Sequence, residues 1–79
     1  MAKAASYVVE GYRRRAGCLA VSERYPGPSE AAIARRGRAM TGRVDGMVFY
    51  RIETSAAGDV WTEIEVLATE GDVPEGIEP

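Results

Sequence analysis

Residues 44–53, VDGMVFYRIE, and residues 60–69, VWTEIEVLAT, carry the clearest strand signals in the chain. Both segments are rich in β-branched and aromatic residues, which favour extended backbone. The polar residues 54–59 between them include a glycine, which is typical of a turn. The two segments therefore predict a β-hairpin in the second half of the chain.

A first hairpin is predicted upstream, from residues 6–12 and residues 18–23, which repeat the same mixture of Tyr, Val and polar residues. Gly17 lies between the two segments and can adopt the positive φ that a short connection needs. The motif Pro26-Gly27-Pro28 is then expected to end the second strand, because proline has no N–H for a ladder.

A helix is predicted between the hairpins, with Ser29 as its N-cap and an end near Met40. Ile33, Gly37 and Met40 fall on one face at helical spacing, which indicates the stripe that packs on the sheet. Gly37 on that stripe is expected to let the helix lie close to a strand.

These elements predict an α+β fold: a two-layer ββαββ domain with an antiparallel sheet and one helix on one face. Residues 1–70 are expected to form this single domain, and residues 71–79 an acidic tail containing Gly and Pro that is partly disordered. Strand alternation gives each strand two faces, and the more aliphatic set is expected under the helix. That set is Gly46, Val48, Tyr50 and Ile52 in the first of the two segments and Val60, Thr62, Ile64 and Val66 in the second.

The opposite face is then expected to be open, with large apolar groups beside carboxylates. Its members are Met47, Phe49, Trp61, Glu63, Glu65 and Leu67. Aromatic residues on an uncovered face are typical of a binding surface, in which tryptophan often acts as an anchor. The alternative is ordinary cross-strand pairing without a binding role.

Charge is divided between the two halves of the chain. Residues 1–43 hold nine Lys and Arg against three Glu, whereas residues 44–79 hold one Arg against nine Asp and Glu. This asymmetry indicates either a charged partner surface or two halves that attract each other across the fold.

Two opposite binding functions are open on the basis of this charge. The acids Glu53, Asp59, Glu63 and Glu65 can imitate phosphates toward a basic surface of a protein partner, or can simply form a solvated edge. Alternatively, Arg13, Arg14 and Arg15 at the first hairpin's tip, with the arginines of the helix, would contact nucleic-acid phosphates. The acidic pI of about 5.1 makes direct nucleic-acid binding the less favoured of the two.

Several functional classes lack support in the sequence. The chain has one cysteine and no histidine, so it offers neither an internal disulfide nor a plausible zinc site. No nucleophile or glycine-rich cofactor motif occurs, and we expect no enzymatic activity, no cofactor and no metal. No apolar run reaches membrane-spanning length. We therefore expect a cytoplasmic protein of a bacterial host cell, either a monomer or a weak dimer.

The chain resembles small uncharacterised alphaproteobacterial proteins in several segments. These are Gly46-Met47-Val48-Phe49-Tyr50-Arg51, Gly58-Asp59, Val66-Leu67-Ala68, Gly71-Asp72-Val73-Pro74 and the Tyr7-Val8-Val9 strand, with an Ala- and Arg-rich helix. Its size, acidic second half and Arg/Ala-rich style are also similar to phage-encoded type I anti-CRISPR proteins. That resemblance implies a non-enzymatic inhibitor that binds a type I surveillance complex (Cascade) and blocks target DNA binding.

Overall fold

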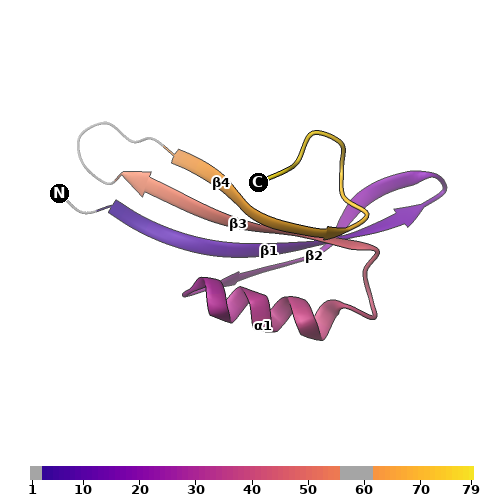
Figure 1. The fold of residues 1–79 in the computed structure, drawn as a ribbon, viewed down its shortest axis with the longest axis horizontal. Helices are drawn as coiled ribbons and strands as arrows, with labels where there is room; N and C mark the ends of the chain where they lie inside the picture. The colour runs from indigo at the N-terminus through magenta and orange to yellow at the C-terminus, as the bar shows by residue number, and fades with distance from the viewer. Residues whose placement is uncertain (1–2, 56–61) are drawn as a thin grey trace.

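A computed structural model describes residues 3–55 and 62–79 of the chain. The elements follow in the order β1 (Lys3–Arg15), β2 (Cys18–Gly27), α1 (Glu30–Met40), β3 (Gly46–Ser55) and β4 (Thr62–Gly71). The strands form one antiparallel sheet in the spatial order β2-β1-β3-β4, and α1 lies along one side of it (Figure 1). The predicted α+β class, with an antiparallel sheet and one helix, is confirmed.

The first hairpin is longer than its sequence signal. Ala16 and Gly17 connect β1 to β2, and both have positive φ, of 51° and 81°. This pair of left-handed residues is the backbone that a tight two-residue hairpin turn requires. The second strand extends past the predicted residues 18–23 and ends at Gly27, so the strand does end within Pro26-Gly27-Pro28 as predicted, although Pro26 itself belongs to it. Because β2 is an edge strand, a proline without an N–H is tolerated there.

The helix begins and ends where the sequence predicts. The Ser29 hydroxyl oxygen accepts a hydrogen bond of 3.1 Å from the N–H of Ala32, which satisfies a free donor of the first turn. Ile33, Gly37 and Met40 are the buried residues of α1. The helix packs on β1, β2 and β3, so β4 lies beside the helix rather than beneath it.

The side of the sheet that faces the helix is the reverse of the prediction. The core under α1 contains Val9, Ile33, Met40, Met47 and Phe49, with Tyr7, Tyr25, Val44 and Leu67 packed against it. The Phe49 ring fits there because Gly37 has no side chain: a Cβ at that position would lie 2.7 Å from Cζ of Phe49. The expectation that Met47, Phe49 and Leu67 lie on an uncovered face was therefore wrong.

The opposite side of the sheet also holds buried residues, namely Val8, Tyr12 and Val48. In Figure 1 the C-terminal segment after β4, coloured yellow, lies on this side, away from α1. Val73, Pro74 and Ile77 in that segment are half-buried. The residues expected beneath the helix lie on this second side instead, because strand alternation places them opposite Met47 and Phe49. Val60 of that set lies outside the described residues.

Asp72 is held by contacts from the end of β1 and from the loop before β3. The Asp72 carboxylate accepts two hydrogen bonds from the Arg14 guanidinium, of 2.9 and 3.1 Å. The Asp72 N–H donates to the carbonyl of Asp45 at 2.9 Å, while the Asp45 carboxylate accepts from the N–H of Arg14 at 2.7 Å. Gly46 is required at this crossing because a side chain there would run into the Asp72 backbone. These contacts join the β1 tip to the start of the C-terminal segment.

Candidate protein-binding surface

A β-bulge in β4 places three glutamates on one side of the sheet. The cross-strand partners are Phe49 with Ala68 and Tyr50 with Val66, so Leu67 is the extra residue in β4. Without the bulge, Glu70 would lie on the opposite side from Glu63 and Glu65, because side chains alternate along a strand. With it, all three lie on the side that carries the helix.

Cross-strand pairing shows which residues surround these glutamates. Glu63 is paired with Glu53, Glu65 with Arg51 and Glu70 with Met47. Arg51 makes ion pairs of 3.3 Å with Glu53 and 4.0 Å with Glu65. Within residues 3–55 and 62–79, neither Glu63 nor Glu70 makes an ion pair. This acidic side, defined here as Glu53, Glu63, Glu65 and Glu70, is therefore only partly neutralised by Arg51.

A groove of about 170 Å³ lies between α1 and β4, next to the acidic side. Its apolar lining is Ala34, Met47, Phe49, Leu67 and Ala68, and its polar lining is Glu30, Arg38, Thr41 and Glu70. The groove exists because the helix does not extend over β4. Glu70 belongs both to this groove and to the acidic side, so the two features are continuous.

The structure brings together only part of the predicted partner-binding set. Glu53, Glu63 and Glu65 lie on one side of β3 and β4, as their pairing requires. Phe49 was expected as an exposed anchor, but it is 8% exposed and packs beneath the helix. Asp59 and Trp61 lie outside the described residues. Strict alternation along β4 could not assign Glu70 to the acidic side, because the bulge carries no distinctive residue.

The three arginines of the nucleic-acid alternative lie at the end of the first hairpin and are exposed. Arg14 is bound to Asp72, which raises the pKa of Arg14 through hydrogen bonding and charge. Among the ion pairs of the described residues, none involves Arg13 or Arg15. The structure therefore leaves two of the three guanidinium groups accessible at this tip.

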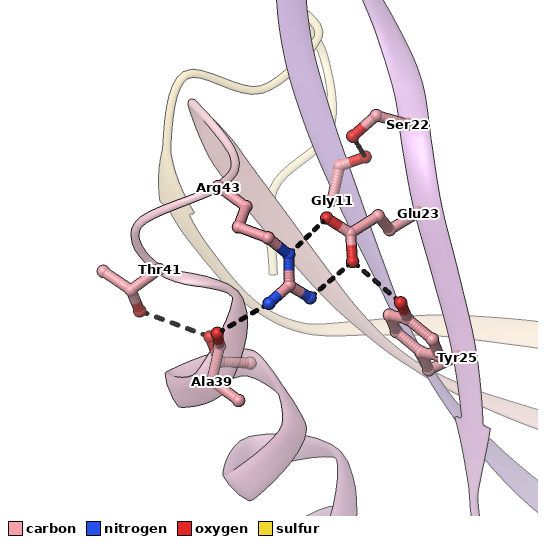
Figure 2. A network of polar contacts seen from close by, with 8 residues as sticks. Gly11, Ser22, Glu23, Tyr25, Ala39, Thr41 and Arg43 are labelled. Atoms are coloured by element: carbon pink, nitrogen blue, oxygen red, sulfur yellow. Dashed lines mark hydrogen bonds and ion pairs between the residues drawn. The ribbon is translucent and has the colours of Figure 1, made fainter.

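Arg43 joins the end of the helix to β2 in a network that the sequence did not reveal (Figure 2). Its guanidinium donates to the Glu23 carboxylate at 2.7 and 3.1 Å and to the carbonyl of Ala39 at 3.2 Å. The Tyr25 hydroxyl donates to Glu23 at 2.8 Å. Arg43 first and Tyr25 second lower the pKa of Glu23 to about 2. This carboxylate is therefore held ionised at neutral pH, as a structural tie.

A second cluster of hydrogen-bonded polar side chains lies on the other side of the sheet. The Tyr12 hydroxyl donates to Glu10 at 2.9 Å, and Arg24 donates to the other carboxylate oxygen of Glu10 at 3.0 Å. Burial, with hydrogen bonding to Tyr50 and Glu10, raises the pKa of Tyr12. A tyrosine shifted in this direction stays protonated at neutral pH, so it is a poor candidate for proton transfer.

Metal, membrane and comparison findings add no further site. Within the part of the chain that the structure describes, no three Cys, Asp or Glu side chains gather as a metal site would require. None of the described helices has the length and apolar character to cross a bilayer. The chain matches no family model, and no curated protein or solved structure matches it significantly.

Proposed function

We propose that the chain is a non-enzymatic inhibitor that binds a basic surface of a protein partner through the acidic side of β3 and β4. The observation that carries this proposal is the bulge at Leu67, which aligns Glu70 with Glu63 and Glu65. Carboxylates in a row on an exposed surface attract a basic surface and raise the association rate. An apolar groove beside them supplies the burial that charge alone does not.

The partner we propose is a type I CRISPR surveillance complex. Support for it comes from the resemblance in size, charge and composition to type I anti-CRISPR proteins, together with the acidic side. A complex that binds DNA must present basic surfaces to phosphates. Carboxylates placed on such a surface would occupy the positions that phosphates otherwise take.

A gel-shift competition tests this function. Purified type I surveillance complex is mixed with the protein before labelled target DNA is added, and in a second series after the DNA has bound. We expect the protein to abolish the shift when it is added first, at a near-stoichiometric ratio. An unchanged shift at saturating protein would refute the partner. Inhibition at a small fraction of the complex, growing with time, would instead indicate catalysis and refute the non-enzymatic assignment.

Direct nucleic-acid binding is a second candidate, favoured by the accessible Arg13 and Arg15 at the hairpin tip. It predicts a salt-sensitive shift of DNA or RNA by the protein alone, because phosphate contacts release counterions. The shift should disappear in the double variant R13A/R15A. Absence of any shift at low salt would remove this candidate and leave the protein-binding proposal intact.

A further inference from the structure

β4 is an edge strand whose free backbone faces outward. The sheet order β2-β1-β3-β4 pairs β4 with β3 on one side, and no other described strand lies on its second side. Such an edge presents unpaired N–H and C=O groups that can pair with an added strand. The strand has ten residues, and the bulge at Leu67 divides it into two regular stretches, 62–66 and 68–71, each of which can pair with an added strand.

The side chains along β4 indicate which side chains an added strand would need. Toward one end lie Glu63 and Glu65, both exposed. Toward the other end, on the same side of the sheet, lies the groove lined by Phe49, Leu67 and Ala68. A partner strand beside β4 would therefore meet acids at alternate positions first and an apolar hollow after them.

We infer that β4 binds an extended basic segment of the protein partner as an added strand. Alternate Lys or Arg residues of that segment face Glu63 and Glu65, and an apolar residue further along enters the groove between α1 and β4. Charge complementarity selects this occupant, because opposite charges on neighbouring strands stabilise the pair and like charges destabilise it. The inference rests on the proposed function and specifies how the acidic side engages its partner.

Two other strand pairings are disfavoured by residues of the two edge strands. A second copy of β4 in antiparallel pairing about the bulge would set Glu63 against Glu70 of the other copy, which is repulsive. The other sheet edge, β2, contains Pro26, which has no N–H to donate to an added strand. β4 is therefore the better edge, and a basic segment is its better partner.

The test uses the full chain and a synthetic peptide, acetyl-Lys-Thr-Lys-Thr-Leu-Thr-Leu-amide. This peptide alternates its side chains as the inferred segment does. A second peptide has the same residues reordered as Lys-Lys-Leu-Leu-Thr-Thr-Thr, and a third keeps the first order but has alternate backbone nitrogens methylated. Affinity is measured by fluorescence anisotropy, and hydrogen exchange of the β4 amides is followed by NMR.

Two protein variants accompany the wild type. Ala68→Trp fills the groove from an exposed position of β4, and Ala20→Trp is its matched control at an exposed position of the opposite edge strand. E63K/E65K removes the acidic contacts. We expect the alternating peptide to bind at least about tenfold more tightly than the reordered or methylated one, since only it can complete the ladder. A68W and E63K/E65K should each weaken it similarly, and A20W should not.

The outcomes separate this inference from the proposed function. Protection of β4 amides by the alternating peptide alone supports strand addition. If E63K/E65K abolishes binding while A68W and backbone methylation leave it unchanged, the acidic side binds without an added strand, and only the inference is overturned. If no basic peptide binds and charge reversal also leaves the surveillance complex inhibited, both the inference and the proposed function fail.

A stable dimer that protects β4 in the absence of peptide would assign the edge to a second copy and overturn the inference. If A68W does not fold, comparing the methylated and unmethylated peptides on the wild-type protein still tests strand addition.

Discussion

At the scale of single residues, the contact between Gly37 and Phe49 determines which side of β3 faces the helix. The sequence indicated that Gly37 lies on the buried stripe of α1, and the structure confirms it. It did not indicate that the missing side chain makes room for an aromatic ring. Phe49 is the largest wholly apolar residue in its strand, so a glycine on the facing stripe was the one signal that could have chosen the correct side.

The variant Gly37→Ala tests this packing. Alanine is the better helix former by up to about 1 kcal/mol, but its Cβ would lie 2.7 Å from Cζ of Phe49. We expect a net loss of roughly 1–2 kcal/mol in the free energy of unfolding, because overpacking a tight core is destabilising. Gly42→Ala is the matched control: its Cβ meets nothing within 4 Å.

Urea denaturation of G37A, G42A and the double variant G37A/F49L measures these differences. The smaller leucine should recover part of the stability lost in G37A, since it removes the ring that the new methyl group contacts. G37A as stable as wild type would contradict the assignment of Phe49 to the helix side.

Glu23 gives a prediction for the dependence of stability on pH. Its pKa is about 2 in the folded chain against an ordinary value of 4.5, so protonation favours the unfolded chain. The contribution of Glu23 is therefore complete above about pH 5 and is lost as the pH falls toward 2. We expect Glu23→Gln to be less stable than wild type at neutral pH, with the difference shrinking through this window.

Urea midpoints measured across that pH range check the prediction. Arg43→Gln should reproduce the effect, and the double variant E23Q/R43Q should cost less than the sum of the two single changes, because both remove the same interaction. A difference between E23Q and wild type that is constant with pH would contradict the role of Arg43 as the main cause of the lowered pKa.

At the scale of elements, local signals predicted which strands and helix exist and their order along the chain. They predicted less well how long each strand is and which side of the sheet faces the helix. The cap at Ser29 and the Gly17 turn are local chemistry, and the structure contains both. Which side of the sheet the helix covers depends on long-range packing, which local signals do not specify. The C-terminal segment, which was expected to be a partly disordered tail, contains half-buried residues. The bulge at Leu67 also reverses which side of the sheet the later residues of β4 occupy, and no residue type in the strand predicts this bulge. The acids were thus identifiable from sequence, but their alignment with Glu70 was not.

The packing of the C-terminal segment on the sheet can be tested by mutation. Ile77 is half-buried, and its N–H donates to the carbonyl of Pro74 at 3.3 Å. It belongs to the C-terminal segment, which lies on the side of the sheet opposite α1 (Figure 1). Truncating a partly buried isoleucine removes apolar area worth about 1 kcal/mol. We expect Ile77→Ala to lower the free energy of unfolding by about that amount, and exposed Glu78→Ala to change it little. Equal stability of I77A and wild type would mean that the segment does not pack on the sheet.

At the scale of the whole molecule, the basic first half and the acidic second half of the chain are joined by one ion pair among the described residues, Arg14 with Asp72. This pair is the attraction across the fold that the asymmetry allowed as one interpretation. Arg51 with Glu53 and Glu65 instead pairs opposite charges within the second half. The other interpretation, a charged partner surface, rests on Glu63 and Glu70, which make no ion pair within residues 3–55 and 62–79. Of these two, Glu70 lines the groove.

The affinity of the charge-reversal variant E63K/E65K for purified type I surveillance complex decides whether the acidic side binds this partner. The matched control is E75K/E78K, which makes the same change in net charge at two exposed positions of the C-terminal segment. Circular dichroism first establishes that both variants remain folded, as exposed substitutions should. We expect E63K/E65K to bind at least about tenfold more weakly than wild type, and E75K/E78K to stay near wild type. Equal affinities for the two variants would contradict this expectation.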